Sequence, residues 1–235
     1  MHRNNTIIQG KTRRRRLILP GVAVLVIFAT AAAAGCGSST DAQSGQNATS
    51  PALNVESRPS AGVVEAIDGM GDTVDPNGNP VSAPREVDIT DASVSKDGQN
   101  LKFTMEVSGR LPNTRPADTG AAEWGFLLDT NGDGKPDWGV YAELPPGQNG
   151  WSYGLYNQST KARQADKQFP GSFSRNGSTL TLTINQSAFG SPANFKWTAY
   201  SDDIAATAVA RQAQQGGDHV PNDAWPLGKH WLDYP

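Results

Sequence analysis

Short segments in which apolar and polar residues alternate strictly are the feature that most constrains the fold of this chain. In one clear case, Leu180, Leu182 and Ile184 alternate with three threonines. A period of two puts successive side chains on opposite faces of a strand, so each such segment predicts a half-buried β-strand. About nine of these segments, separated by turn-forming residues, predict an all-β fold, an antiparallel β-sandwich with at most one or two short helices. Residues 205–214 have the only helix-favouring composition.

An acidic loop at residues 129–137 is the strongest candidate metal site in the sequence. Oxygen ligands occur at every second position, and Gly134 falls at the sixth, where a calcium-binding loop turns sharply. Ca²⁺ takes about six to eight oxygen ligands, and a short loop of this kind can supply most of them. We therefore expect calcium to be bound by Asp129, Asn131, Asp133, the backbone carbonyl of Lys135, and Asp137. The alternative is a hairpin turn of the same composition that binds nothing.

The loop is not an EF-hand. Its twelfth position, which is a bidentate glutamate in EF-hands, is Val140. The flanking residues alternate as in strands, with Trp124, Phe126 and Leu128 on one side of the loop. We therefore predict that the ion lies at the tip of a β-hairpin and that a carboxylate or water from elsewhere completes its shell.

Residues 1–35 have the pattern of a bacterial lipoprotein signal peptide. They contain six basic residues, no acidic residue and an apolar stretch from Leu17 to Ala34, and they end just before Cys36. This resembles the lipobox, which implies cleavage before Cys36 and attachment of a diacylglyceryl group to its thiol. Residues 36–60, rich in Ser, Gly and Ala, would then tether the lipid to a domain at residues 61–235. The alternative is an uncleaved membrane span.

Removal of this segment leaves an acidic protein. The whole chain has 20 basic and 23 acidic side chains, and residues 1–35 hold 6 of the basic ones, so the remainder has 14 against 23 and a net charge of −9. Nucleic-acid binding needs a basic face, so this charge argues against it. The charge suits a protein that collects divalent cations. We expect the domain on the extracytoplasmic face of a bacterial cell membrane.

Four segments together resemble a group of exported bacterial β-sandwiches. They are residues 75–79, 87–94, 128–138 and 218–223. In this arrangement the chain is similar to family-9 carbohydrate-binding modules and DOMON-like domains over about residues 70–225. The resemblance implies the sandwich fold more firmly than sugar binding, because one sandwich carries many functions.

Scattered acidic residues suggest a second metal site at one edge of the sandwich. The candidate ligands are Asp75, Asp88, Asp218 and Asp223. They are far apart in the sequence, so only folding could bring them together. The alternative is that residues 75–79 form a turn and that the other carboxylates are solvated.

A G-x-S-x-G motif at residues 150–154 raises the question of catalysis. Asp202 and His219 follow Ser152 in the order of an α/β-hydrolase triad. That motif requires a strand, a tight turn and a helix, whereas residues 151–155 alternate like a strand. The histidines also lack the spacing of a zinc site. We therefore expect that the protein is not an enzyme.

Six tryptophans and five tyrosines allow a sugar-binding interpretation. Rings on loops or exposed strands could stack on a glycan, and the candidates are Trp151, Tyr153, Trp225 and Trp231. Core packing is the alternative, since it takes most aromatic residues of a sandwich. It is the prediction for Trp124, Trp138 and Trp197, which lie on well-patterned strands.

These observations predict a lipid-anchored, calcium-stabilised β-sandwich with a binding or structural role. Its expected partners are the membrane and either a glycan or an envelope protein. A carbohydrate-binding module for cell-wall glycan is the first alternative, and an envelope hydrolase is the second. Residues 222–235, aromatic and interrupted by proline, either cover an edge strand or form a partner-binding tail.

Overall fold

The structure of the protein is a computed structural model that describes residues 63–74, 80–203, 217–220 and 231–235. All of these residues belong to one compact unit, residues 49–235. Several features predicted above lie outside the described residues: the signal peptide, Cys36, the tether, the helix at 205–214, Asp75, Asp223 and Trp225. Within the described residues, no helix has the length and apolar character needed to cross a membrane.

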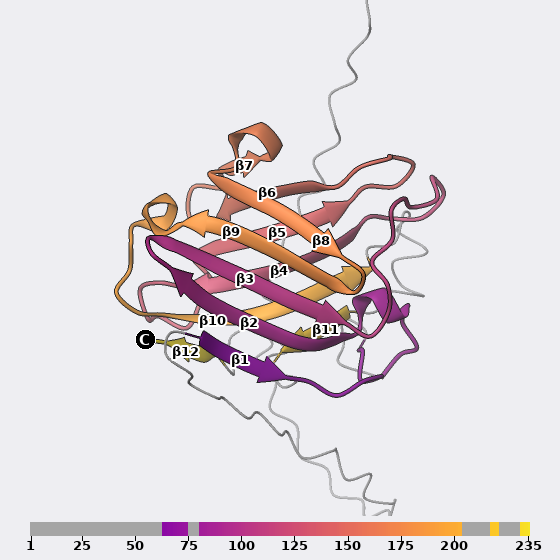
Figure 1. The fold of residues 1–235 in the computed structure, drawn as a ribbon, viewed down its shortest axis with the longest axis horizontal. Helices are drawn as coiled ribbons and strands as arrows, with labels where there is room; N and C mark the ends of the chain where they lie inside the picture. The colour runs from indigo at the N-terminus through magenta and orange to yellow at the C-terminus, as the bar shows by residue number, and fades with distance from the viewer. Residues whose placement is uncertain (1–62, 75–79, 204–216, 221–230) are drawn as a thin grey trace, which may run out of the picture. The chain divides into compact units, whose positions relative to one another are not determined.

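Two antiparallel sheets pack as a sandwich (Figure 1). The five-stranded sheet has the order β1 (Val63–Ile67), β2 (Ile89–Asp97), β3 (Asn100–Val107), β9 (Thr179–Asn185) and β8 (Gly171–Asn176). The seven-stranded sheet has the order β11 (Gly217–Val220), β10 (Phe195–Asp203), β4 (Ala122–Asp129), β5 (Trp138–Leu144), β6 (Ser152–Asn157) and β7 (Arg163–Ala165), and β12 (Leu232–Tyr234) also pairs with β10. The described residues contain no α-helix but three short 3₁₀ helices, η1 (Arg85–Val87), η2 (Asp166–Gln168) and η3 (Gln186–Phe189).

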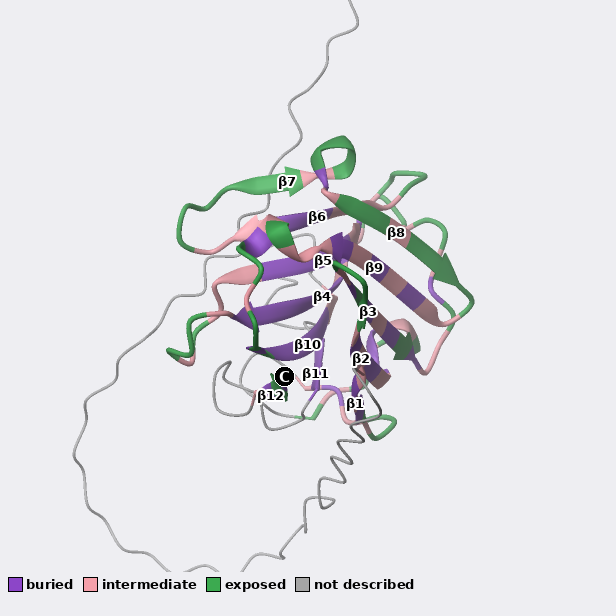
Figure 2. Ribbon diagram, turned by 60° about the vertical axis from the view of Figure 1, so that its left-hand side comes forward, coloured by how far each residue is buried: buried purple, intermediate pink, exposed green. Residues whose placement is uncertain are grey.

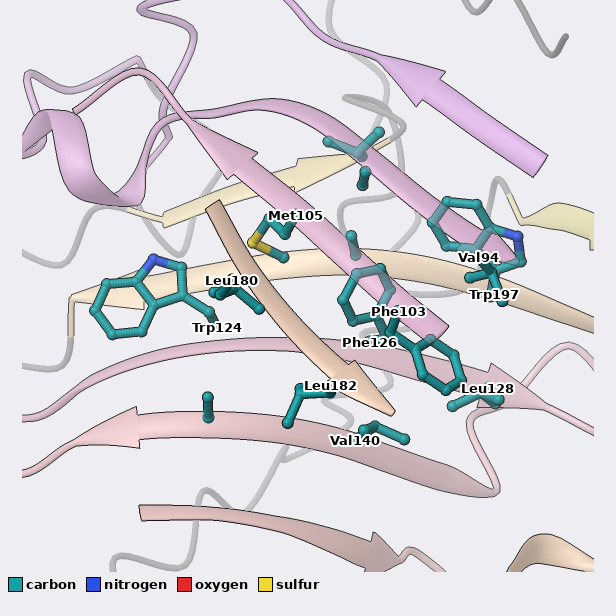
Figure 3. Packing of buried hydrophobic residues seen from close by; sticks show 14 of the residues in the cluster. Val94, Phe103, Met105, Trp124, Phe126, Leu128, Val140, Leu180, Leu182 and Trp197 are labelled. Atoms are coloured by element: carbon teal, nitrogen blue, oxygen red, sulfur yellow. The ribbon is translucent and has the colours of Figure 1, made fainter. Parts of the chain in front are cut away.

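The alternation in the sequence becomes the inner and outer faces of the sheets. In β9, Leu180, Leu182 and Ile184 are fully buried, whereas the threonines between them are only partly buried. Phe103 of β3 lies 5.2 Å from Phe126 of β4, centroid to centroid, and Figure 3 shows both rings among the side chains of the core. Burial of apolar area stabilises a fold by roughly 25 cal/mol per Å². This shared core therefore holds the two layers together.

The predicted fold class is confirmed, and the acidic loop does connect two strands, β4 and β5. The prediction missed four strands of three to five residues, which are β1, β7, β11 and β12. Segments this short contain too few alternations to stand out from their surroundings. The pairing of β12 with Phe195–Trp197 of β10 shows that the end of the C-terminal segment joins a sheet.

One side of the sandwich brings the segment that follows β1 of one sheet to β11 of the other. In Figures 1 and 2 both strands lie at the lower side of the sandwich. An isolated bridge between Val74, seven residues after the end of β1, and Gly217 of β11 has backbone hydrogen bonds of 2.9 and 3.0 Å. On the opposite side, β8 is almost entirely exposed (Figure 2). The linked edge is where acidic side chains converge.

Candidate metal centre

Three carboxylates meet at the linked edge of the sandwich. Asp68 and Asp72 come from the loop that follows β1, and Asp218 comes from β11. One oxygen from each lies within 4.8 Å of the others, and Asp218 is buried while the other two are partly buried. We call this group the edge triad.

The loop after β1 has a defined shape. The N–H of Asp68 donates to the Thr90 carbonyl at 3.1 Å, which continues the pairing of β1 with β2. Gly71 has a φ of +83°, where L-residues are strained, and its N–H donates to Asp88 Oδ1 at 2.9 Å. A Cβ at Gly69 would lie 3.1 Å from Asp72 Oδ2. The glycines thus allow a tight loop that turns its two acids towards β11.

Backbone hydrogen bonds from both sheets hold the side chain of Asp218 in place. Its Oδ2 accepts the N–H of Ile89 at 2.6 Å, from the start of β2, and its Oδ1 accepts the N–H of His219 at 2.8 Å. In the register of β10 and β11 it lies opposite Ser201, whose hydroxyl donates to the carbonyl of Val87. A carboxylate has about four lone-pair sites, so these bonds leave each oxygen able to bind a cation.

The three neighbouring carboxylates of the edge triad favour the binding of positive charge. Burial, followed by the nearby carboxylates of Asp68 and Asp72, raises the pKa of Asp218 to about 9. The metal-free triad therefore holds a proton at neutral pH, because three close carboxylates cannot all ionise easily. Burial lowers the pKa of the neighbouring His219 to about 4, so its neutral ring brings no compensating charge.

The oxygens of the edge triad are close enough together to share one hard cation. Oxygens bound to Ca²⁺ lie about 2.3–2.6 Å from the ion, so two of its ligands are at most roughly 4.6–5.2 Å apart. The ion would need further oxygens to reach the usual six to eight. The three carboxylates are thus a partial cation shell.

The residues predicted for the second metal site have a mixed outcome. Asp218 is in the edge triad, and Asp75 and Asp223 lie outside the described residues. Asp88 is not in the triad, because its Oδ1 accepts from Gly71 and its Oδ2 accepts the Ser108 hydroxyl at 2.6 Å. It supports the loop that carries the other ligands. The nearest sequence signal was the run Asp68-Gly69-Met70-Gly71-Asp72, which was not recognised.

The acidic loop at residues 129–137 is closed by its own side chains. Asp129, only 1% exposed, accepts the N–H groups of Gly132 at 2.6 Å and Gly134 at 2.9 Å. Both glycines have a φ of +79°, which explains why the turn needs them. The carboxylate of Asp129 thus organises the turn from a buried position.

The other predicted ligands also bond within the loop. Asp137 accepts the hydroxyl and N–H of Thr130 and the amide of Asn131 at 2.7 to 2.9 Å. Asn131 accepts the N–H of Asp133 at 2.8 Å, and Asp133 accepts that of Lys135 at 2.8 Å. In the described part of the chain, the loop carboxylates do not form a second group as close as the edge triad. Calcium binding by the loop stays a prediction.

The hydrolase-like residues do not form a triad. Ser152, Glu143, Glu123 and Asp202 lie in one row across β6, β5, β4 and β10. Strands in a sheet are about 4.8 Å apart, so Ser152 and Asp202 are roughly 14 Å apart. His219 lies one strand further away, on β11. The Ser152 hydroxyl instead donates to Asp166 Oδ1 at 3.0 Å.

The same row forms a polar network on the outer face of the seven-stranded sheet. Burial raises the pKa values of Glu123 and Asp202 to about 7. Tyr200 donates its hydroxyl to Glu123 at 2.5 Å. Arg163 pairs with Glu143 at 2.9 Å. Tyr200 and Arg163 thus provide partners for two acids of this row, Glu123 and Glu143.

The rings of Trp151 and Tyr153 are engaged in packing. Trp151 stacks on Phe173 at 5.4 Å, and Tyr153 stacks on the same ring at 5.2 Å. The indole N–H of Trp151 donates to the Pro112 carbonyl at 3.2 Å. The remaining tryptophans that the structure describes are fully buried (Trp124 and Trp197, as predicted) or partly buried (Trp138 and Trp231).

Comparison with known proteins identifies no relative: no family model, no curated protein and no solved structure matches the chain. The fold defines the class of protein, an all-β, two-sheet antiparallel sandwich. Its distinguishing feature is an acidic edge triad that can hold a metal ion.

Proposed function

We propose that this chain is a lipid-anchored, extracytoplasmic protein whose β-sandwich binds Ca²⁺ and has a binding or structural role rather than a catalytic one. The observation that carries the proposal is the convergence of Asp68, Asp72 and Asp218 at one edge of the sandwich. An ion at this place would join the loop after β1 to β11, and so tie one sheet to the other.

Calcium is the proposed ion because of the ligand type. All three donors are carboxylate oxygens, which hard cations prefer, whereas Zn²⁺ favours nitrogen and sulfur. Mg²⁺ demands a near-ideal octahedral shell and usually keeps several waters, so it is less suited than Ca²⁺ to a shell built from protein carboxylates.

The acidic loop is proposed as a second and weaker calcium site. Its ligand order supports the proposal, but its oxygens already accept hydrogen bonds from the turn. It also lacks a carboxylate at the twelfth position, where Val140 stands. We therefore assign it an affinity at the weak end of extracellular modules, a dissociation constant near 1 mM.

The anchor part of the proposal rests on residues 1–36 of the sequence. A diacylglyceryl group on Cys36 supplies two acyl chains, which hold a protein stably at a membrane, whereas one chain binds reversibly. Cys36→Ala should release most of the protein from the membrane fraction of an expressing bacterium. Retention of that variant at the wild-type level would mean that residues 1–35 span the membrane.

The sandwich is also proposed to be related to family-9 carbohydrate-binding modules and DOMON-like domains. The two antiparallel sheets and the acidic hairpin loop support this relationship. The rings of Trp151 and Tyr153 contact other rings, so we do not extend the proposal to glycan binding.

Thermal melting of the chain purified from membranes, with 1 mM Ca²⁺ or with chelator, tests the calcium proposal. With a dissociation constant of about 0.1 mM at the edge triad, calcium should stabilise the fold by about 1.4 kcal/mol, or several degrees. Asp72→Asn should remove most of this rise. Asp118→Asn is the matched control, because Asp118 is exposed and is not one of the triad carboxylates.

The outcomes separate the two candidate sites. A rise that survives Asp72→Asn but is lost in Asp133→Asn would move the stabilising ion to the acidic loop. Identical melting curves with calcium and with chelator would remove calcium from the proposed function altogether.

A further inference from the structure

Four Asn-Gly pairs occur in the chain, and this dipeptide is the one most prone to spontaneous deamidation. In that reaction the backbone nitrogen of the glycine attacks the side-chain carbon Cγ of the asparagine. Glycine permits the attack because it has no Cβ to shield its nitrogen. The pair at 77–78 lies outside the described residues, and the pairs at 131–132, 149–150 and 176–177 lie within them. The fold gives these three pairs different surroundings.

The pair Asn131-Gly132 is held by the hydrogen bonds of the acidic loop. The N–H of Gly132 donates to Asp129 Oδ1 at 2.6 Å, so the attacking nitrogen is already engaged. The side-chain amide of Asn131 donates to Asp137 Oδ1 at 2.9 Å, and its oxygen accepts the N–H of Asp133 at 2.8 Å. The ring that forms during deamidation can therefore close only after several of these bonds have broken.

The pair Asn176-Gly177 lies where β8 turns into β9. Asn176 is the last residue of β8 and pairs with Thr179 of β9. Gly177 has a φ of +64°, and its carbonyl accepts the N–H of Leu111 at 3.0 Å. The extended backbone of a strand keeps the nitrogen of the next residue away from Cγ. Ring closure here therefore requires the end of the hairpin to open.

The pair Asn149-Gly150 has neither kind of restraint. Both residues are exposed, and neither makes a hydrogen bond to any residue that the structure describes. A Cβ built on Gly150 would meet no heavy atom within 4 Å, so the space around this glycine is open. The glycine nitrogen can therefore approach the asparagine side chain without any native bond being broken.

We propose that Asn149 is a site of spontaneous deamidation in the folded protein. The Gly150 nitrogen loses its proton to solvent base and forms a bond to Cγ of Asn149, and the Cγ–Nδ2 bond breaks to release ammonia. Water then opens the resulting succinimide at either carbonyl, which gives aspartate or isoaspartate. Either product adds a carboxylate that is ionised at neutral pH. This inference does not depend on the proposed function.

The isoaspartate product would change the backbone between two anchored residues. On one side, the N–H of Gly147 donates to the Arg115 carbonyl at 3.0 Å. On the other side, the indole N–H of Trp151 donates to the Pro112 carbonyl at 3.2 Å. Isoaspartate carries the main chain through the former side chain and so lengthens it between these anchors. The modification would thus alter the loop that leads to Trp151 and leave the sequence of the strands unchanged.

Incubation of the chain purified from membranes in nonionic detergent, followed by digestion and peptide mass spectrometry, tests the proposal. The spectra locate each amide that has become an acid. In the folded protein Asn149 should convert at least about tenfold faster than Asn131 or Asn176, a difference of about 1.4 kcal/mol in barrier, because only these two must first lose hydrogen bonds. The rate at Asn149 should rise with pH, because the attacking nitrogen must lose a proton.

Two controls separate the fold from the dipeptide. Peptides obtained by digestion before the incubation have lost the fold, so all three pairs should convert in them at similar rates. Gly150→Ala places a methyl group in open space, so the variant should fold normally, and the shielded nitrogen should slow conversion about tenfold. Conversion of Asn131 or Asn176 as fast as that of Asn149 in the folded protein would overturn the proposal. So would an Asn149 that stays an amide in the folded protein while its peptide converts.

Discussion

The acidic loop and the edge triad use aspartate in opposite ways. In the loop, Asp129 accepts two backbone N–H groups of its own turn, and Asp137 accepts three hydrogen bonds from the residues that begin it. In the triad, Asp218 faces two carboxylates from a segment near the other end of the domain. The first arrangement closes a hairpin, whereas the second brings like charges together.

This difference affects how well each group of residues predicts a bound ion. When candidate ligands lie within one short loop, their oxygens can accept hydrogen bonds from the backbone of that loop, so the pattern predicts the turn more firmly than the ion. A cluster assembled by tertiary folding brings together carboxylates that are far apart in the sequence. Their mutual repulsion can be offset by protons or by a cation. The edge triad is therefore the better indicator of metal binding.

The largest effect should come from removing the buried carboxylate of the loop. Asp129→Ala leaves the N–H groups of Gly132 and Gly134 without their acceptor, which we expect to lower the free energy of unfolding by about 2–3 kcal/mol. The loss should be nearly as large in chelator as in calcium. Urea unfolding followed by tryptophan fluorescence measures it. A loss below about 0.5 kcal/mol would mean that the turn does not depend on this residue.

An intermediate effect should appear in the pH dependence of the metal-free protein. Folding raises the pKa of Asp218 from its ordinary 3.8 to about 9, so the folded state binds the proton more tightly than the unfolded state. The resulting stability is complete below about pH 4 and is lost as the pH rises towards 9. Between pH 7 and 9 we expect a fall of about 1–2 kcal/mol in chelator.

Two controls connect this fall to the edge triad. Saturating Ca²⁺ should flatten the curve, because the ion takes the place of the proton, and Asp218→Asn should flatten it without calcium. The carboxyls of Glu123, Asp202 and Asp91, whose pKa values are raised to about 7, contribute mainly below this window. Denaturant melts at stepped pH measure the effect. A slope that persists in Asp218→Asn would assign it to another group.

The smallest effect should come from the exposed acid of the loop. Asp133→Asn keeps the oxygen that accepts the Lys135 N–H, so stability in chelator should hardly change. In 1 mM Ca²⁺ the loss should be only about 0.4 kcal/mol, the stabilisation expected for a dissociation constant near 1 mM. Titration calorimetry at higher calcium should nevertheless show one bound ion fewer. An unchanged number of ions would make the loop a plain turn.

Sequence reasoning predicted the parts of this molecule that depend on local patterns. Alternation in segments such as residues 179–185 was sufficient for the sandwich, and the acidic loop was correctly placed between two strands. Strands β1 and β11 were missed, because four or five residues pair only where tertiary structure holds them. The edge triad lies in the loop after β1 and on β11.

The composition of the triad could not be predicted for a related reason. Asp218 was recognised as a ligand candidate, but its partners depend on how the loop after β1 meets β11 across the sandwich. Nothing local distinguishes Asp88, which supports the loop through Gly71, from Asp68 and Asp72, which face Asp218. The spacing of residues along the chain can predict ligands that lie within one loop, but it cannot predict ligands that come from two sheets.

The position of β1 has a mechanical consequence. Among the described strands it pairs with β2 alone, so it is an edge strand, and it is also the first of them along the chain. A pull on the chain before Val63 would reach this strand first and could peel it away one residue pair at a time, towards Ile67. The loop with Asp68 and Asp72 lies where such peeling would arrive next. In the proposed arrangement, with the chain anchored through Cys36, an ion shared with β11 would oppose this peeling, and the calcium concentration would then affect the force needed to unfold the domain.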